Sequence, residues 1–437
     1  MQAVETPKMG IWMTTALVVG GMIGAGIVLL PVSLAPLGYN AVIGWFVSGI
    51  GALCLAYALA IISRQDGQGI QAYIERLLGP TVGFAVTWAF WVTVWVSSAA
   101  MALASASAVS LVMPGIGTDR AVAVLALAMV VFLVGINALG ARATGRTAIV
   151  TVLIKITPLL AVIVIVLIRG GGERSFEAIA PLPVNFDNIA TASALTLFAL
   201  LGFETATAPV DKVRNPARTI PLAIIVGTAF VALLYLCSTT ALSLVLPVGE
   251  VVISRAPFAT AVGSYWGADA AMLAALAMAV SAFGALNGGI MIAGELGYSM
   301  ALRKDLPALF ARANKRGTPI VSQLIAAALT IALILANLSR DTAGFFTFLI
   351  LLATSATLWL YLAGAIAALR LRPGPASVAA IAVGILFVGF AFYGSGAEAN
   401  LWGIVLLAIG LALRWLMRRT RGSSPAAAAN PAAPRGS

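Results

Sequence analysis

Charged residues are scarce in this sequence of 437 residues, and histidine is absent. Only 9% of the residues are Asp, Glu, Lys or Arg, against about a quarter in soluble domains, whereas 61% are apolar. So few charges cannot cover a water-soluble surface of this size, which excludes a soluble domain, a nucleic-acid-binding protein and a disordered chain. Without histidine, the usual zinc ligand and the usual proton shuttle near neutral pH are missing. The composition is that of a membrane protein.

Cysteines and catalytic motifs are equally sparse. The two cysteines, Cys54 and Cys237, lie inside apolar runs, so a disulfide framework and a metal knuckle are both excluded. The sequence contains no Walker-type phosphate loop, no Ser-His-Asp set and no cluster of metal ligands. The sequence therefore lacks the residues that an ATP-driven pump or a membrane hydrolase requires. We expect no enzyme activity, no metal and no cofactor.

Long apolar runs alternate with short polar segments along the chain. A spanning helix needs about 20 mainly apolar residues. Twelve such runs are expected at residues 10–37, 41–63, 82–112, 121–141, 147–168, 188–209, 219–247, 268–300, 318–338, 342–369, 376–394 and 398–417. The first run lacks a short apolar core with a small-residue cleavage site, which favours a span over a signal peptide.

The basic residues sort to one side of these twelve spans. With a cytoplasmic N-terminus, 20 of the 26 Lys and Arg residues lie in cytoplasmic segments, five lie in outer loops, and Lys155 lies within the membrane. This split satisfies the positive-inside rule. With an odd number of spans, the basic residues would not gather on one side of the membrane. We therefore expect a multi-pass plasma (inner) membrane protein with both termini in the cytoplasm. The net charge of +11 then indicates topology and not nucleic-acid binding.

Two of the spans are interrupted near the middle. The first carries four glycines within residues 20–26, followed by Pro31, and the sixth carries Gly202 and Glu204 at a similar depth. Backbone N–H and C=O groups that lose their helical hydrogen bonds at membrane depth are tolerated only where they line a cavity or are buried in protein. Tight packing of small residues is the alternative for the first span, but it needs two spaced glycines and not a cluster. Interruptions five spans apart fit a five-plus-five inverted repeat, whose half-helix ends and free carbonyls suit an amino acid zwitterion.

Three charged side chains remain at membrane depth. Placing the ionisable side chain of Glu204 in the middle of a span costs free energy, and such a residue by default marks a functional site. Lys155 lies about 12 Å of helix rise into the fifth span, which argues against simple snorkelling to the surface. Glu295, in the inner part of the eighth span, either contacts a cytoplasmic vestibule or pairs with a loop cation. With histidine absent, Lys155 and Glu204 are the main candidates for proton coupling and gating, and Glu295 is a further one.

Residues 21–31 (GMIGAGIVLLP) resemble the first-span signature of the amino acid–polyamine–organocation (APC) superfamily. Residues 202–204 and 213–221 look like the sixth span of that family and the loop after it. Residues 306–319 and 393–402 are similar to its basic amino acid/polyamine antiporter branch, which includes arginine/agmatine exchangers. The resemblance runs from about Met9 to Trp415. It implies an all-α LeuT-type fold of twelve transmembrane helices, in which ten core helices form two inverted repeats with a broken first and sixth helix, and two helices follow at the C-terminus.

The resemblance also implies how the chain is organised. The expected parts are a cytoplasmic tail at residues 1–9, a first repeat at 10–168, a periplasmic loop at 169–187, a second repeat at 188–369, two final spans at 370–417 and a disordered cytoplasmic tail at 418–437. Homodimers are common in that branch. The candidate partners are therefore a second copy of the chain, the lipid bilayer and a small amino acid or amine.

The resemblance assigns residues to a substrate site. In the family, the unwound backbone of the first and sixth spans binds the substrate carboxylate and amine, and the matching residues here are Ile23, Gly24, Ala25, Gly26, Ala199, Leu200 and Gly202. Side-chain positions on the third, sixth and eighth spans complete the pocket: Phe90, Ser98, Met101, Phe198 and Gly289. Phe198 keeps the ring of the gating aromatic but not the Trp of the arginine exchanger, and Gly289 replaces the Trp that stacks on guanidinium.

Two of the buried charges also match family positions. Glu204 matches the sixth-span Glu that is tied to pH-dependent gating. Lys155 looks like the fifth-span lysine of sodium-independent relatives, whose ammonium replaces a bound cation between the first and eighth spans. Less secure candidates for its neighbours are Gly21, Met22, Ser281 and Ala282.

The substrate is left open by these departures. A desolvated cation–π contact contributes about 2 kcal/mol or more, so losing one stacking Trp makes a smaller or neutral amino acid as good a candidate as arginine. We expect a sodium-independent secondary transporter of amino acids or amines, either an antiporter or a proton symporter, working by alternating access. The alternatives are arginine/agmatine-type exchange specifically, and a membrane receptor or channel-like protein that binds an amino acid without coupled turnover.

Overall fold

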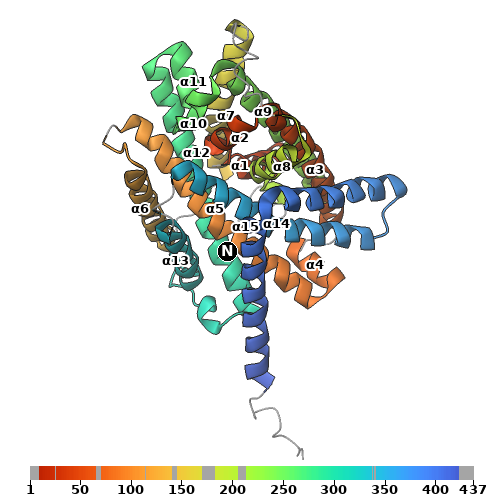
Figure 1. Cartoon of the computed structure of the whole chain (residues 1–437). Helices are drawn as coiled ribbons and strands as arrows, with labels where there is room; N and C mark the ends of the chain where they lie inside the picture. The colour runs from red at the N-terminus through yellow and green to blue at the C-terminus, as the bar shows by residue number, and fades with distance from the viewer. Residues whose placement is uncertain are drawn as a thin grey trace, which may run out of the picture.

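The computed structural model describes residues 9–24, 26–64, 70–113, 115–139, 145–169, 183–204, 213–336, 338 and 341–422. Within these ranges the chain is helical almost throughout (Figure 1), and a single isolated parallel bridge joins Met9 to Val213. The helices up to residue 200 are α1 (Ile11–Met22), α2 (Gly26–Leu34), η1 (Ala35–Leu37), α3 (Tyr39–Ser63), α4 (Ile70–Leu78), α5 (Pro80–Val112), α6 (Asp119–Ala138), α7 (Gly145–Arg169) and α8 (Phe186–Leu200). Those that follow are α9 (Pro216–Val245), α10 (Val248–Ile253), α11 (Pro257–Trp266), α12 (Ala268–Leu302), η4 (Ala308–Ala311), α13 (Ile320–Ala336), α14 (Thr342–Arg370) and α15 (Pro375–Gly422).

Most of the long helices can cross a membrane. By length and apolar composition, eight of the described helices qualify, or nine if the bent pair formed by α1 and the α2–η1 segment counts as one span. The two halves of that pair meet at 46°. Every predicted run contains a helix, but α8 has 15 residues and α13 has 17, so both are short for a full span. The described chain is thus a nearly all-helical, multi-span membrane protein.

The last helix, α15, contains both of the final predicted spans. It runs over 48 residues and is interrupted at Gly396, whose φ of 80° is left-handed and suits glycine. In Figure 1 its final part runs down and away from the other helices. The helix continues to Gly422, so residues 418–422 of the tail predicted to be disordered are helical.

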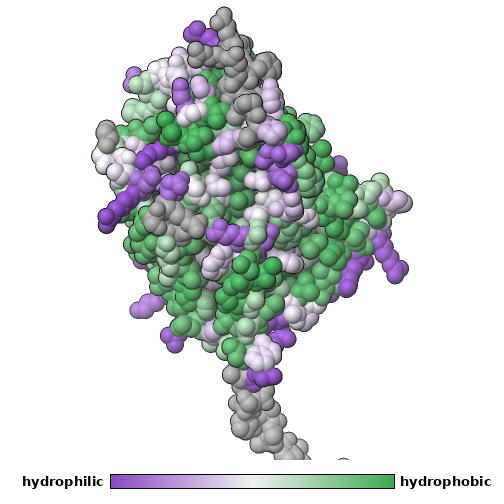
Figure 2. Space-filling model, in the orientation of Figure 1, coloured by the Kyte–Doolittle hydropathy of each residue, from purple (hydrophilic) through white to green (hydrophobic). Residues whose placement is uncertain are grey.

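The surface of the protein is broadly apolar. Figure 2 shows hydrophobic side chains over most of the visible face, with hydrophilic side chains gathered in a few patches. Large apolar side chains are exposed on several helices, as with Trp12 at 83%, Phe46 at 61% and Leu386 at 74%. Such extensive exposure of apolar side chains is expected where the surrounding solvent is hydrocarbon.

Helix α5 and the second interrupted helix, α8, lie inside this bundle. The middle of α5 is buried on all sides, as the 0% exposure of Val96, Ala99 and Ala100 shows, and it packs against α12 and α14. Helix α8 packs against α3, α14 and α15. The approach of α3 is close enough that a Cβ on Gly44 would lie 2.6 Å from the Cβ of Ala192. Small residues therefore allow the surrounding helices to fix α8 in place.

Some of the features predicted from the sequence lie outside the described residues. These are Ala25 of the substrate site, residues 1–8 and 423–437 of the two tails, residues 170–182 of the periplasmic loop, and residues 205–209 at the end of the sixth predicted span.

Candidate functional site

The first break separates α1 from α2. Helix α1 ends at Met22, and Ile23 has extended backbone angles, with φ −78° and ψ 92°. The N–H of Ile23 still donates to the carbonyl of Val19 at 2.8 Å, and the new helix begins at Gly26. The carbonyls at the end of α1 consequently lack their usual helical donors and need others. The glycine cluster predicted this interruption at its observed position.

Two side chains donate hydrogen bonds to these carbonyls. The Nζ of Lys155 on α7 lies 2.9 Å from the Gly20 oxygen and 2.7 Å from the Ile23 oxygen. The hydroxyl of Tyr235 on α9 donates to the Met22 oxygen at 3.2 Å, and Tyr235 is fully buried. The ammonium therefore lies directly on the broken end of α1, where hydrogen bonds from a charged donor are stronger than neutral ones.

The second break follows α8. That helix ends at Leu200, Leu201 is extended, and Gly202 has a left-handed φ of 110°. Glycine is required at this point for two reasons. A side chain strains this φ, and a Cβ at Gly202 would lie 2.8 Å from the carbonyl oxygen of Gly21. The turn then leads to Phe203 and Glu204.

Glu204 accepts hydrogen bonds from a backbone N–H and from a side-chain hydroxyl. Its Oε2 accepts a hydrogen bond from the Gly202 N–H at 3.3 Å and from the Tyr361 hydroxyl on α14 at 3.1 Å. Glu204 is 8% exposed, and Phe203 stacks on the Tyr361 ring with centroids 4.9 Å apart. Tyr361 thus fixes both the ring and the carboxylate that follow the break, as a buried carboxylate requires.

The two breaks touch each other. Besides the contact between Gly202 and Gly21, a Cβ on Gly26 would lie 2.9 Å from the Cα of Ala199 and 3.3 Å from the Phe198 ring. The backbone of the α1–α2 segment therefore packs directly on the end of α8. Of the backbone residues predicted from the sequence, this contact brings Gly26 next to Ala199.

Side chains from α5 and α12 lie beside the first break. A Cβ on Gly289 would lie 2.7 Å from the Ser98 Oγ and 3.9 Å from the Met101 sulfur. A Cβ on Gly24 would lie 4.0 Å from the Met101 methyl group. The structure thus groups Gly24, Ser98, Met101 and Gly289 as predicted, with Phe198 on the α8 side.

Other predicted residues lie apart from this group. Phe90 shares the face of α5 that carries Ser98, but eight residues of helix, about 12 Å, separate the two. Glu295 is exposed on α12, and none of its described contacts is an ion pair. Ser281 and Ala282 are buried on α12, and among the described residues the Ser281 hydroxyl has no hydrogen-bond partner.

Sequence reasoning missed Tyr235 and Tyr361. Both tyrosines lie in apolar helices, where a tyrosine usually indicates packing or a membrane interface. Their hydrogen-bond partners are 213 and 157 residues away in sequence. The one available signal was that a buried tyrosine hydroxyl needs a partner, and the breaks supply polar groups at that depth.

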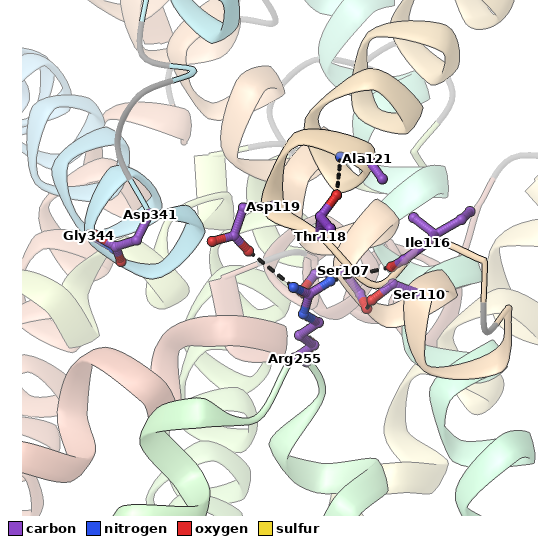
Figure 3. A network of polar contacts seen from close by, with 9 residues as sticks. All are labelled: Ser107, Ser110, Ile116, Thr118, Asp119, Ala121, Arg255, Asp341 and Gly344. Carbon is purple, nitrogen blue, oxygen red and sulfur yellow. Dashed lines mark hydrogen bonds and ion pairs between the residues drawn. The ribbon is translucent and has the colours of Figure 1, made fainter.

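A polar network holds the loop between α10 and α11 (Figure 3). The Arg255 guanidinium donates to the Ile116 carbonyl at 3.3 Å and to the Asp119 carboxylate at 3.1 Å. The Arg255 carbonyl accepts from Ser107 on α5 at 3.0 Å. Because the Arg255 and Asp119 side chains are 30% and 50% exposed, their ion pair contributes only about 0–1 kcal/mol. These contacts fasten the loop but include no residue of the predicted site.

Further contacts join the broken helices to their neighbours at opposite ends. Ser33 on α2 and Thr347 on α14 share a hydrogen bond of 2.7 Å. At the start of α1, the Arg214 N–H donates to the Met9 carbonyl at 2.9 Å, which ties α1 to the segment preceding α9. The described contacts therefore fasten the first broken helix on both sides of its break.

Known proteins are similar to this chain in sequence over most of its length. Two putrescine transporters named PotE are each 28% identical: that of Escherichia coli over 95% of this chain and 98% of its own length, and that of Haemophilus influenzae over 94% and 97%. The cadaverine/lysine antiporter of Escherichia coli is 28% identical over 77% of this chain and 76% of its own length. The model of the amino acid permease family matches residues 9–402. This chain therefore belongs to the amino acid permease family of membrane transporters.

Proposed function

We propose that this protein is a sodium-independent secondary transporter that carries amino acids or aliphatic amines by alternating access. The proposed arrangement is the LeuT type, with residues 10–168 and 188–369 as the two inverted repeats and two further spans at the C-terminus. The substrate binds where the two breaks meet. Support comes from the contact between Gly202 and Gly21, which joins two interrupted helices of the kind that bind substrate in such transporters.

The observation that carries the proposal is the position of Lys155. Carbonyls freed at the end of a broken helix ordinarily coordinate a cation. Here the Lys155 ammonium donates to two of these carbonyls, at 2.9 Å and 2.7 Å, and so supplies a covalently attached positive charge. A site that carries its own cation does not need sodium to complete it. This is the physical reason for proposing sodium independence.

The substrate class that fits best is an aliphatic amine or amino acid. The relatives named above include transporters of putrescine and an antiporter of cadaverine and lysine. Gly289 leaves this position of α12 without a ring to stack on a planar guanidinium, whereas a flexible aliphatic amine needs no such platform. Glu204 supplies a carboxylate beside the second break, which suits a substrate ammonium. Arginine/agmatine exchange is the less favoured alternative.

Two polar contacts would have to change as the site opens to either side. The Glu204–Tyr361 hydrogen bond joins the second break to α14, and the Ser33–Thr347 hydrogen bond joins α2 to the same helix. We propose that breaking one and keeping the other exposes the site to one face at a time. Protonation of Glu204 would weaken its bond to Tyr361 and so couple a proton to this step.

The proposed topology places both termini in the cytoplasm, with a homodimer as the assembly. The excess of basic residues in the predicted cytoplasmic segments supports the orientation. Impermeant thiol labelling of single cysteines introduced by Thr118→Cys and by Ser424→Cys, in a background that carries Cys54→Ala and Cys237→Ala, checks it. Thr118 is exposed and lies in a predicted outer loop, so only the first variant should react from outside intact cells. Crosslinking in native membranes tests the dimer.

Counterflow in liposomes tests the proposed function. Purified protein is reconstituted without sodium, the vesicles are preloaded with unlabelled putrescine, cadaverine, lysine, arginine or a neutral amino acid, and uptake of the labelled compound is measured. An exchanging transporter accumulates label transiently only in preloaded vesicles. A receptor shows no uptake, a channel needs no preload, and a strict requirement for sodium contradicts the role given to Lys155.

A further inference from the structure

A small cavity lies between α2, α3 and α9, with α10 at its edge. Its volume is about 20 Å³, and its apolar wall includes Pro31 and Leu34 of α2. Its polar wall is formed by Trp45 of α3 and by the hydroxyl residues Thr239, Thr240 and Ser243 of α9. An adjoining hollow of about 10 Å³ shares Leu34 and Ser243 and extends toward Gly38.

Two polar groups in this wall are buried without a partner. Trp45 is 2% exposed, and neither its Nε1–H nor the Thr240 hydroxyl forms a hydrogen bond with any described residue. Leaving such groups unsatisfied costs about 1–3 kcal/mol each in a protein interior, so native structures rarely do so. Both residues line the same cavity, so a single ligand in it can serve both groups.

The other two hydroxyls offer the complementary function. Thr239 donates its proton to the Tyr235 carbonyl at 2.7 Å, and Ser243 donates to the Thr239 carbonyl at 3.1 Å. Each hydroxyl oxygen therefore keeps lone pairs free to accept. The wall thus holds two free donors and two free acceptors, which is the pattern that one water molecule satisfies with all four of its hydrogen bonds.

We propose that this cavity is a binding site for one ordered water molecule that accepts from Trp45 and Thr240 and donates to Thr239 and Ser243. The volume agrees, because a bound water needs about 10–15 Å³ of such space, and about 20 Å³ leaves no room for a larger ligand.

The water site supports the first break through one intermediate contact. The ring of Trp45 packs edge-on against the ring of Tyr235, with centroids 5.5 Å apart. Tyr235 in turn donates to the Met22 carbonyl. By fixing the indole, the water holds Tyr235 in the position from which it reaches the break. Trp45 and Thr240 are therefore positioning residues, and neither contacts the substrate.

Water-edited solid-state NMR tests the site directly. The protein is labelled with ¹⁵N at the tryptophan indoles and placed in lipid bilayers, and magnetisation transfer from water to each indole is measured. Trp45 is assigned by the signal lost in Trp45→Phe. Trp91 is the matched control, because it is also 2% exposed but donates its Nε1–H to the Ala293 carbonyl at 3.0 Å.

The expected result is transfer to Trp45 several-fold faster than transfer to Trp91. Equal, slow transfer to both indoles would overturn the proposal, since a dry cavity contains no water to donate magnetisation. This readout is independent of transport activity, so it stands whether or not the transported substrate has been identified.

A second measurement tests the role of Thr240. If its hydroxyl binds the water, Thr240→Val removes a satisfied group and lowers the melting temperature by about 2 °C. The matched control is Thr228→Val on the same helix, because Thr228 is also buried without a described partner but lies outside the cavity wall. Thr228→Val should leave the melting temperature unchanged or raise it. A rise for Thr240→Val equal to that of the control would remove Thr240 from the site.

Discussion

The two breaks satisfy opposite needs of the backbone. At the first break, the free groups are carbonyls at the end of α1, and they accept from the Lys155 ammonium and the Tyr235 hydroxyl. At the second, the Gly202 N–H donates to the Glu204 carboxylate, which the Tyr361 hydroxyl also binds. A basic side chain thus stabilises one break and an acidic side chain the other.

The breaks also differ in how they can be perturbed. At the first break, two side chains from two helices, Lys155 of α7 and Tyr235 of α9, donate to the free carbonyls. At the second break, the side chain that binds the backbone is Glu204, which follows the break itself. If the comparison is correct, losing the charge at the first break should stop transport. Losing one neutral donor there should be tolerated better than losing the neutral donor at the second break.

The largest effect is expected for Lys155→Met, which keeps the aliphatic stem and removes the ammonium. Two carbonyls lose hydrogen bonds to a charged donor, worth about 1.5–3 kcal/mol each, so the initial rate of counterflow should fall by more than about tenfold. Leu153→Ala is the control, because Leu153 lies on the same helix and is 63% exposed. If the Lys155→Met variant and the unaltered protein showed the same rate of counterflow between about pH 5 and pH 8, Lys155 would have no part in the mechanism.

The next largest effect is expected for Glu204→Gln, which keeps the shape and an acceptor oxygen but removes the charge. We expect counterflow of amines to fall by about five- to tenfold and the remaining rate to lose its dependence on pH, because the group that binds the proton is gone. Glu75→Gln is the control, since Glu75 forms an exposed ion pair with Arg303 on the surface. A pH profile identical to that of the unaltered protein would assign proton coupling elsewhere.

A smaller effect is expected for Tyr361→Phe, which leaves the ring stacked on Phe203 and removes only the hydroxyl. One hydrogen bond to a buried carboxylate is lost, so the maximal rate should change by about three- to fivefold while the KM changes less. Tyr57→Phe is the matched control, because the Tyr57 hydroxyl bonds Ser377 away from both breaks. Equal rates for the two variants would contradict a gating role for Tyr361.

The smallest effect is expected for Tyr235→Phe. The Met22 carbonyl loses its donor, but Lys155 continues to bind the carbonyls on either side, so the rate should fall by no more than about threefold. A loss as large as that of Lys155→Met would mean that the neutral donor, and not the charge, holds the first break. The initial rate of counterflow with the same substrate measures this difference.

The sequence predicted the breaks better than it predicted their support. The glycine cluster at residues 20–26 and the Gly202–Glu204 turn are local patterns, and each break appears where its pattern occurs. Lys155 and Glu204 could be selected because a charge in an apolar run is conspicuous. Tyr235 and Tyr361 could not, because their roles depend on partners far away along the chain, and a tyrosine in such a helix is otherwise unremarkable.

The helices were predicted as a set, but their lengths were not. Apolar composition alone extended the sixth span to residue 209, whereas α8 ends at Leu200, where the extended Leu201 and the left-handed Gly202 stop the helix. The grouping of Ser98, Met101 and Gly289 came from the family resemblance, and the close approach of α12 to α5 agrees with it. The Arg255 network was not predicted, since an arginine in an outer loop gives no sign of its partner.

We propose that the two breaks form one substrate site bordered by Met101 of α5. The most direct test uses the single thiol of a Met101→Cys variant in a background that also carries Cys54→Ala and Cys237→Ala. The rate of its modification by a small methanethiosulfonate reagent is measured with and without the transported compound. The account predicts that this compound slows modification with a half-maximal concentration close to its KM for counterflow, and that an untransported amine does not. Modification that is unaffected by a saturating transported compound would contradict the claim.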